Sequence, residues 1–301
     1  MINVIGKKNL FFILSGIVII PGLISTILFG LKPGIDFTGG SRLEFSYKNS
    51  IANTDEVKSI FNKNTKVDTI STTGPNTISV RTEPIDEKTK KTIIANLAKE
   101  FPGTSEKSFQ TIGPSIGKET EVNAFKAVLI ASVAITLYIA FAFRKVSKPV
   151  SSWKYGVCAI AALLHDVLAV IGIFSILGHF FGVEIDSLFI TALLTVMGFS
   201  VHDTIVVFDR IRENLSKSFG HQFEDVVNDS LLETMNRSVN TSLTVLIVLF
   251  ALLVFGGESI RWFVAALLIG IISGTYSSIF NASPLLVVWY EWDKRKKKRK
   301  K

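Results

Sequence analysis

The sequence predicts a membrane α-helical protein with six transmembrane helices and an α+β domain inserted after the first of them. Three observations support this fold class. Hydrophobic residues make up 48% of the 301 residues, the mean hydropathy is +0.41, and one long polar segment, 32–123, interrupts a series of apolar runs. Such a composition is too apolar for an ordinary soluble protein. The only cysteine, Cys158, lies in an apolar run, so no disulfide framework is predicted.

Six apolar runs reach or approach the about 20 residues that an α-helix needs to cross a bilayer. These runs are 10–31, 127–143, 155–178, 187–208, 238–257 and 262–290. The first follows Lys7 and Lys8, as a signal peptide would, but it continues into GLKPGIDF, which has no small-residue cleavage pattern. We therefore expect a cytoplasmic N-terminus with a membrane anchor at 1–31, a domain at 32–123, five further helices within 124–290 and a basic tail at 291–301.

The distribution of basic residues predicts the orientation in the membrane. Eight of the 33 Lys and Arg residues form the tail KRKKKRKK, and more lie after the second and fourth runs, at Arg144, Lys145, Lys148, Lys154, Arg210, Arg212, Lys217 and Arg237. Loops 179–186 and 258–261 contain a single Lys or Arg residue, Arg261. The positive-inside rule then predicts that both termini are cytoplasmic and that 32–123 lies outside. Membrane lipids are the expected partner of the tail and nucleic acid is not expected, while contact with a ribosome stays open.

The polar segment 32–123 alternates strand and helix signals. Strands are predicted at 41–47, 66–72, 76–82 and 105–113, and helices at 54–61 and 85–101, with a turn at Gly74-Pro75. The order β-α-β-β-α-β is the ferredoxin-like pattern. Because the segment contains no His or Cys, we expect a binding or docking module. Gly39 and Gly40, in GIDFTGGSRLEF, are expected to allow close backbone approach; a phosphate loop is the alternative, but no Lys-Ser/Thr follows.

Polar side chains inside the predicted spans are the candidate functional residues. The fourth span carries His202, Asp203 and Thr204 in GFSVHDTIVVFDR, the third carries His165 and Asp166, and the fifth opens with Arg237 and Asn240. Such residues are costly in hydrocarbon and mark pathways or partners. Consecutive antiparallel spans place Asp203 and Arg237 at similar depth, so we expect them to pair.

A carboxylate beside an arginine stays ionised, and it takes up a proton when the arginine moves away. We therefore predict a proton relay, driven by about 2.3 kcal/mol per charge per 100 mV of membrane potential. The relay residues are predicted to be Asp203, Arg237, His202, Thr204, Asn240 and Asp166. The alternative is an ion pair that only holds the helices together. His165 and Asp166 point about 100° apart on a helix, so they are not expected to face one partner. No metal or cofactor site is expected.

Small residues and an amphipathic segment predict further contacts. Gly270 and Gly274 form a small-xxx-small pattern that lets another helix approach closely, and Gly198 is a further small residue at a helix interface. The segment 219–234 has apolar residues at helical spacing and is expected to lie on the membrane surface, with a docking surface as the alternative. Pro21 and Pro284 are expected to mark kinks.

Several motifs together resemble the SecF side of the SecD/SecF family of bacterial protein-export membrane proteins. They are GIDFTGGSRLEF, GFSVHDTIVVFDRIREN, MNRSVNTSLTV and GIISGTYSSIFNASPL, and the resemblance covers nearly the whole chain except the basic tail. It implies a six-span bundle related to resistance-nodulation-division transporters, in the bacterial inner membrane. It also implies a partner, SecD, beside the SecYEG channel, and promotion of preprotein export by the proton-motive force. The family's proton-carrying Asp and Arg fall on Asp203 and Arg237, and His202 stands where relatives often have Asn or another polar residue.

Three other classes of function remain to be weighed. Half of a small-molecule exporter of the resistance-nodulation-division type would be expected to carry larger outer domains. An intramembrane aspartyl protease using Asp166 and Asp203 would be expected to show Gly-x-Gly-Asp, which neither residue has. A passive scaffold would use the polar residues only for packing. We therefore expect no enzyme activity, and a subunit of protein translocation is the leading prediction.

Overall fold

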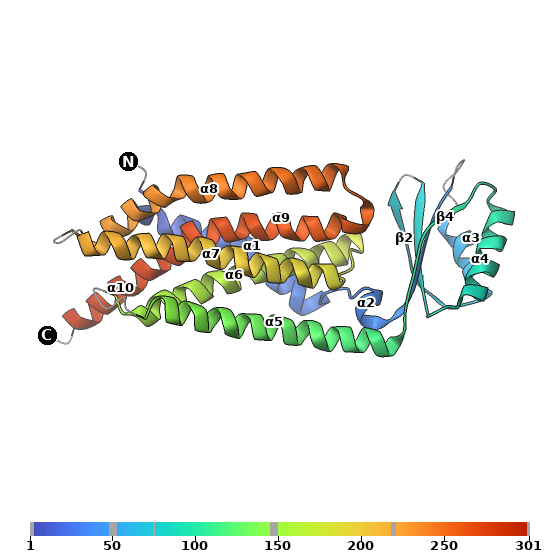
Figure 1. Cartoon of the computed structure of the whole chain (residues 1–301), viewed down its shortest axis with the longest axis horizontal. Helices are drawn as coiled ribbons and strands as arrows, with labels where there is room; N and C mark the ends of the chain where they lie inside the picture. Colours follow the sequence, from blue (N-terminus) through green and yellow to red (C-terminus); the bar gives the residue numbers. More distant parts are fainter. Residues whose placement is uncertain (1–2, 48–52, 75, 145–149, 218–220, 300–301) are drawn as a thin grey trace. The chain divides into compact units, whose positions relative to one another are not determined.

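The computed structural model describes residues 3–47, 53–74, 76–144, 150–217 and 221–299. The chain divides into two compact units (Figure 1). One, called the helical unit below, contains Met1–Leu31, Ala127–Val183 and Leu188–Lys301. The other, called the sheet unit, contains Lys32–Lys126 and also Glu184–Ser187, which connects two helices of the first. The predicted basic residues Lys145 and Lys148 lie outside the described residues.

The six predicted spans are confirmed, because six helices of the described residues are long and apolar enough to cross a membrane. The helices are α1 (Lys8–Phe29), α5 (Pro114–Ala142), α6 (Ser152–Phe181), α7 (Ser187–Lys217), α8 (Phe223–Phe255) and the run of α9 (Arg261–Ser277) into α10 (Ser283–Lys298). Short 3₁₀ turns, Ile5–Lys7 and Glu258–Ile260, precede α1 and α9. Between α9 and α10 the chain forms a π-helical segment, Ser278–Ala282, just before Pro284.

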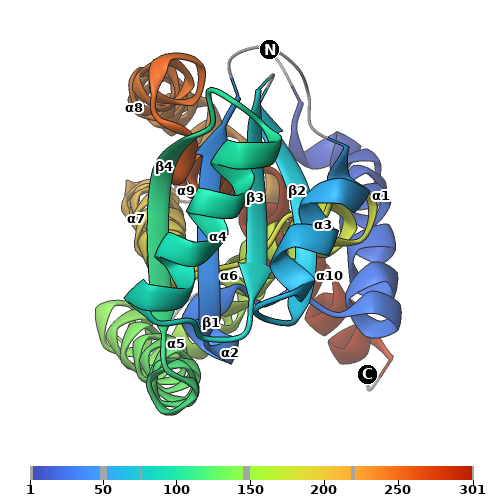
Figure 2. The same cartoon turned by 90° about the vertical axis from the view of Figure 1, so that its right-hand side faces the viewer.

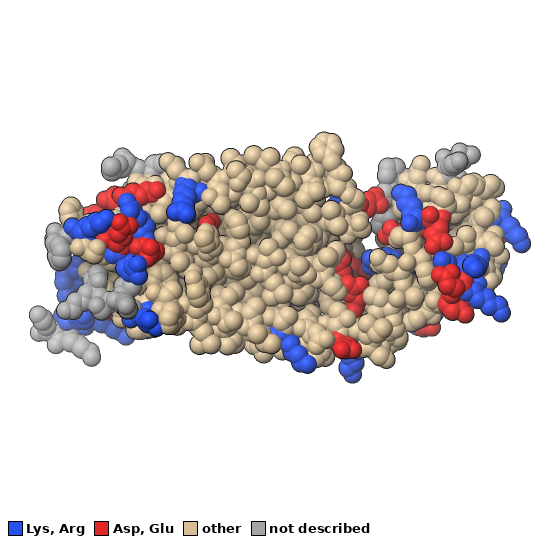
Figure 3. All heavy atoms as spheres, in the orientation of Figure 1, with Lys and Arg blue, Asp and Glu red and all other residues tan. Residues whose placement is uncertain are grey.

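Burial separates the helices of the helical unit into two groups. In the apolar windows of α6, α7 and the α9–α10 run, 50% of the residues are buried, against 11% in α1, 6% in α5 and 17% in α8. The last three therefore present most of their side chains to the surroundings of the unit. Charged side chains gather at the end of the bundle that carries both termini, and the middle of the visible face is almost free of them (Figure 3). This distribution is typical of a helix bundle that spans a membrane.

The sheet unit has the predicted β-α-β-β-α-β order, so the ferredoxin-like prediction is confirmed. Its strands are β1 (Gly40–Ser46), β2 (Val67–Gly74), β3 (Thr77–Thr82) and β4 (Ser105–Ile112), in the order β2-β3-β1-β4 with antiparallel neighbours. Helices α3 (Thr54–Asn62) and α4 (Glu87–Glu100) cover one face of the sheet (Figure 2). A short helix, α2 (Ile35–Thr38), precedes β1. Pro75 of the predicted turn lies outside the described residues.

Local sequence signals explain both long helices of the sheet unit. Asn53 caps α3 by accepting a hydrogen bond from the Asp55 amide at 3.1 Å, and Asp86 caps α4 by accepting from the Thr89 amide at 2.9 Å. The apolar stripes of these helices then meet the inward side chains of the strands. The resulting core contains Leu43, Phe45, Val57, Ile60, Phe61, Val80, Ile93 and Leu97, all at most 2% exposed.

The prediction of a separate amphipathic helix over 219–234 was wrong. Helix α8 runs without interruption from Phe223 to Phe255. Phe223, Val227 and Leu231 are buried in the main hydrophobic cluster of the helical unit, with residues of α7 and α10. The apolar stripe therefore packs on protein rather than on lipid, and it extends the transmembrane helix by several turns. Phe219, included in the prediction, lies outside the described residues.

Candidate functional site

Asp203 is buried in α7, with an exposed fraction of 3%. Its Oδ2 atom has no hydrogen-bond partner in the described part of the chain. The next residue, Thr204, shares a 2.8 Å hydrogen bond with Ser278, whose hydroxyl also lies 3.2 Å from the carbonyl oxygen of Ser200, to which it donates. Asp203 is thus next to a junction between α7 and the π-helical segment of the last span. An unpartnered carboxyl oxygen in such a place is costly when it is ionised.

Arg237 and Asn240 lie on the exposed side of α8, and His202 lies on the exposed side of α7. Arg237 is in no ion pair within the described residues, so the expected pairing with Asp203 is not formed in this structure. Thr241, one turn further along α8, turns its hydroxyl back to the Arg237 carbonyl at 2.9 Å. Three of the predicted relay residues, His202, Arg237 and Asn240, are therefore exposed on these two helices.

Asp166 of α6 has the opposite surroundings. It is fully buried, at 0% exposure. Its Oδ2 accepts hydrogen bonds from Ser200 at 2.5 Å and Ser277 at 2.7 Å, and its Oδ1 accepts from Ser273 at 2.7 Å. The Nδ1 atom of His165 lies 3.0 Å from Oδ1. One carboxyl group thus joins α6, α7 and α9, and we call this group of five residues the Asp166 cluster.

Sequence reasoning missed the three serines of the Asp166 cluster. Ser273 and Ser277 are four residues apart on α9, so they share a helix face, and this spacing is the signal that could have identified them. His165 and Asp166 were not expected to face one partner. Here they contact each other directly, since Nδ1 of His165 lies 3.0 Å from Oδ1 of Asp166. The Nε2 atom of His165 is buried and has no hydrogen-bond partner in the described residues.

The interface glycines differ in their surroundings. A Cβ atom at Gly270 would lie 2.1 Å from Cγ2 of Val196, and one at Gly274 would lie 3.1 Å from Cβ of Ser200, so α7 and α9 approach closely beside the Asp166 cluster. A Cβ atom at Gly198 would meet nothing within 4 Å. In the sheet unit, Gly39 and Gly40 have φ angles of +73° and +120°. Cβ atoms there would lie 2.8 Å from Cα of Pro114 and 2.7 Å from the Thr82 carbonyl oxygen, respectively.

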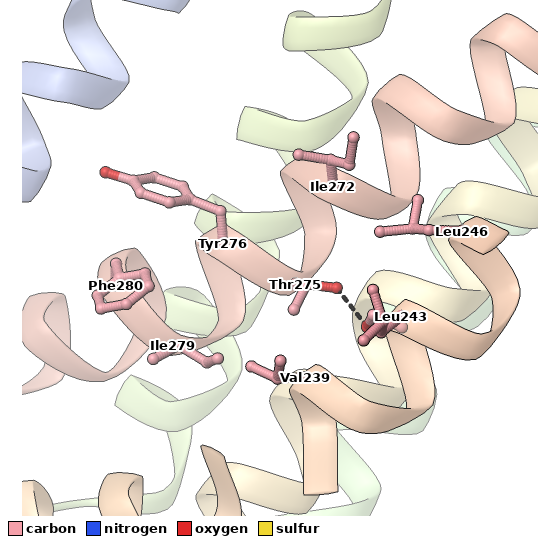
Figure 4. A pocket seen from close by; sticks show the side chains of 9 residues that line it. Val239, Leu243, Leu246, Ile272, Thr275, Tyr276, Ile279 and Phe280 are labelled. Carbon is pink, nitrogen blue, oxygen red and sulfur yellow. Dashed lines mark hydrogen bonds between the residues drawn. The ribbon is translucent and has the colours of Figure 1, made fainter. Parts of the chain in front are cut away.

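An apolar groove of about 260 Å³ lies between α8 and α9 (Figure 4). Val239, Leu243, Ile272 and Ile279 are among its lining residues, and a 2.6 Å hydrogen bond between Ser242 and Thr275 crosses its wall. This lining offers no charged group to bind a polar ligand. Among the described residues, no group of three or more His, Cys, Asp or Glu side chains could hold a metal ion.

Comparison with known proteins gives matches over nearly the whole chain. Residues 91–292 match the family model "Protein export membrane protein SecD/SecF, C-terminal", and residues 24–51 match the "SecD/SecF GG Motif". The protein translocase subunit SecF of Thermobaculum terrenum is 49% identical over 97% of this chain and 95% of its own length. That of Anaerolinea thermophila is 45% identical over 97% of this chain and 96% of its own length.

Fused relatives show how the same fold occurs in a longer chain. The protein translocase subunit SecDF of Bacillus subtilis is 36% identical over 98% of this chain, which covers 38% of that protein. The crystal structure of SecDF from Thermus thermophilus, described as a translocon-associated membrane protein, superposes with a TM-score of 0.84 at 32% identity. This match covers 96% of the present chain and 38% of the solved one. The chain thus corresponds to one part of these longer proteins.

Proposed function

Because the chain belongs to the SecD/SecF family of protein export membrane proteins, we propose that it uses the proton-motive force, together with SecD, to promote the late export of preproteins. A role in protein translocation follows from the family. One observation gives the main support for the use of protons. Asp203 is only 3% exposed, and its Oδ2 atom has no hydrogen-bond partner in the described residues. A carboxyl group in such a site is stable in its protonated form and becomes stable as an anion only when a cation or water approaches.

Arg237 is the cation that we propose for this exchange. It is exposed on α8, one helix after Asp203, and it is in no ion pair among the described residues. In the proposed cycle, Asp203 holds a proton while Arg237 stays away, and it releases the proton when Arg237 approaches. Thr204, His202 and Asn240 would pass protons or water to this site. The filled hydrogen bonds of Asp166 support a positioning role for that residue within the relay.

SecD is the partner that we propose for the exposed polar residues of α7 and α8. A charged side chain on a transmembrane helix rarely faces lipid and normally faces protein or a water-filled cavity. His202, Arg237 and Asn240 are exposed when the chain is alone, so a second membrane subunit would cover them. The name of the relative from Bacillus subtilis, SecDF, of which this chain covers 38%, supports an association with SecD. We further propose that the pair acts beside the SecYEG channel on preprotein substrates.

We propose that the protein lies in the bacterial inner membrane with both termini in the cytoplasm and the sheet unit outside. The charged residues at the end of the bundle that carries both termini support this orientation (Figure 3). The basic residues of α10, Lys294 to Lys298, continue its helix beyond the apolar part of the span. Anionic lipid headgroups are the proposed contact for them.

Replacing Asp203 tests the proposal most directly. In cells that carry the partner subunit, Asp203→Asn is expected to reduce preprotein export and proton conductance of membrane vesicles by about 100-fold or more, since an amide cannot carry the proton. The amount of protein in the membrane should stay near normal. Asp209→Asn is the matched control, because Asp209 lies on the same helix but is exposed and paired with Arg212 at 2.6 Å. Normal export by Asp203→Asn would exclude a proton relay through this residue.

A further inference from the structure

His165 lies at the edge of the Asp166 cluster, within the helical unit. Its side chain is 15% exposed, whereas that of Asp166 is completely buried. Nδ1 of His165 lies 3.0 Å from Oδ1 of Asp166, and Nε2 is buried without a hydrogen-bond partner in the described part of the chain. The imidazole therefore has one nitrogen against a carboxyl group and one nitrogen that the cluster does not use.

The hydrogen bonds of Asp166 match an ionised carboxylate. The hydroxyl groups of Ser200, Ser273 and Ser277 all donate to its two oxygens, at 2.5 to 2.7 Å. A carboxylate anion only accepts hydrogen bonds, and hydroxyl donors aimed at it stabilise its charge. A buried anion in a membrane helix also needs a cationic partner. Among the described residues, no Lys or Arg forms an ion pair with Asp166, and His165 is the basic side chain that contacts it.

The contact with Asp166 determines which nitrogen of His165 carries a proton. Because an ionised carboxylate can only accept, Nδ1 must be the donor. In the neutral imidazole, Nε2 then holds a lone pair. A proton taken up from water at Nε2 forms one N–H bond and converts the ring into an imidazolium, whose positive charge balances that of Asp166. Release of the same proton to water restores the neutral ring.

The other neighbours of His165 leave Nε2 available. Tyr276 of α9 faces the imidazole, with the ring centroids 6.3 Å apart, but its hydroxyl donates to the Phe11 carbonyl at 2.7 Å. Lys8, the only charged residue of α1, is paired with Glu291. The serines of α7 and α9 in the cluster donate to Asp166. Nε2 is thus the atom of the cluster at which a proton can be added without breaking a hydrogen bond.

Ser200 connects the Asp166 cluster with the surroundings of Asp203. Its hydroxyl donates to Asp166 at 2.5 Å, and its carbonyl accepts a hydrogen bond from Ser278 at 3.2 Å. Ser278 shares a 2.8 Å hydrogen bond with Thr204, the residue after Asp203. A change of charge beside Asp166 therefore acts on a network of hydrogen bonds that extends to the neighbour of Asp203.

We propose that His165 is a second proton-binding site of the helical unit, with Nε2 as the atom that takes up the proton. Asp166 is its permanent anionic partner, which positions the imidazole and does not itself carry the proton. This inference rests on the proposed function, because it adds a proton-binding residue to the relay proposed for Asp203. It also gives the three serine hydroxyls a task, which is to keep Asp166 ionised beside His165.

The protonation of His165 can be observed directly in the full-length protein. The chain contains 4 histidines, so NMR spectra of protein labelled with ¹⁵N-histidine are simple, and the signals missing from His165→Asn belong to His165. The neutral ring is expected to carry its proton on Nδ1, and Nε2 is expected to gain a proton as the pH is lowered. A neutral ring with its proton on Nε2 would overturn the proposal. So would an Nε2 atom that stays unprotonated over the whole pH range in which the protein is folded.

Proton conductance tests whether this site takes part in the relay. In membrane vesicles that contain the chain and its partner subunit, His165→Asn is expected to lower proton conductance about tenfold or more. Asparagine keeps an N–H donor on a short side chain but cannot take up a proton, so the amount of protein in the membrane should stay near normal. His179→Asn is the matched control, because His179 is an exposed residue of the same helix that stacks on Phe29. Unchanged conductance in His165→Asn, or an equal loss in His179→Asn, would contradict the proposal.

A double variant tests the positioning role of Asp166. If Asp166 acts through His165, Asp166→Asn should lower proton conductance, and combining it with His165→Asn should cause no further loss. The NMR spectrum of Asp166→Asn should show that the neutral His165 ring no longer prefers the proton on Nδ1. Losses that multiply in the double variant would mean that the two residues act separately, and the proposed pair would be wrong.

Asp203→Asn, measured in parallel, distinguishes this inference from the proposed function. Loss of conductance in Asp203→Asn with normal conductance in His165→Asn would overturn the second site and leave the relay through Asp203 intact. Normal conductance in Asp203→Asn with a loss in His165→Asn would overturn the relay through Asp203 and support His165 as a proton site. Normal conductance in both variants would overturn both.

Discussion

The surroundings of Asp166 and of Asp203 differ in a way that separates two uses of a buried acid. Asp166 has four polar neighbours, three of them serine hydroxyls from α7 and α9, whereas Asp203 leaves one carboxyl oxygen without any within the described residues. A carboxylate that is fully hydrogen-bonded gains little from a new cation or proton. One that lacks partners changes its state easily when its surroundings change. The comparison shows that Asp166 links three helices through its hydrogen bonds, whereas the proposal of proton exchange at Asp203 rests on the carboxyl oxygen that lacks such a bond.

The largest difference is expected in stability. Asp166→Ala leaves Ser200, Ser273 and Ser277 without their common acceptor and should lower the free energy of unfolding of the helical unit by about 3–5 kcal/mol. Asp203→Asn should change it by less than about 1 kcal/mol, because its Oδ2 has no partner to lose. Thermal unfolding of the purified protein in detergent measures both. Equal losses would mean that the two acids do not differ in structural role.

Close packing beside the Asp166 cluster should give the next largest effect. Gly270→Ala places a methyl group 2.1 Å from Cγ2 of Val196 and should destabilise the helical unit by about 1–3 kcal/mol through overpacking. Gly198→Ala is the matched control on α7, since nothing lies within 4 Å of its added carbon. The same unfolding measurement applies. If Gly198→Ala lowered the stability more than Gly270→Ala, the close contact between α7 and α9 would not be at Val196 and Gly270 and the prediction would be wrong.

The smallest effect concerns a carboxylate outside the membrane helices. The hydrogen bonds from Thr89 lower the pKa of Asp86, which is fully exposed at the start of α4. A lowered pKa in the folded state adds stability above the ordinary value of 3.8, and this contribution disappears as the pH falls through the folded value. The protection factors of the amides in the first turn of α4, which correct hydrogen exchange for its intrinsic pH dependence, should therefore decrease at acidic pH. Asp86→Ala should remove this pH dependence, and an unchanged dependence would assign it to another group.

Much of the fold could be predicted because its signals are local. Apolar runs of sufficient length identified all six spans, and alternation in SRLEFSY with the caps before α3 and α4 identified the sheet unit. The error at 219–234 has a physical cause. An apolar stripe does not reveal whether it will face lipid or other helices, and here Phe223, Val227 and Leu231 face other helices.

The candidate site could be predicted only in part. Charge within an apolar run identified Asp203, Arg237 and Asp166, because such residues are rare and costly in a membrane. Their partners were not predictable in this way. Serine is common in transmembrane helices, and Ser200 and Ser277 gain meaning only when α7 and α9 bring them to Asp166. The expected Asp203–Arg237 pair relied on equal depth, but depth does not decide which side of a helix faces its neighbour.

The sequence by itself determined the number of spans, the order of strands and helices and the presence of acids within the membrane, since each of these depends on neighbours along the chain. Only the tertiary structure decided which polar groups meet. Asp166 meets Ser200 from 34 positions away, and Glu184 meets Arg42 from 142 positions away. The physical reason is that hydropathy and helical period define what a segment becomes, whereas hydrogen bonds and ion pairs form wherever packing brings two segments together.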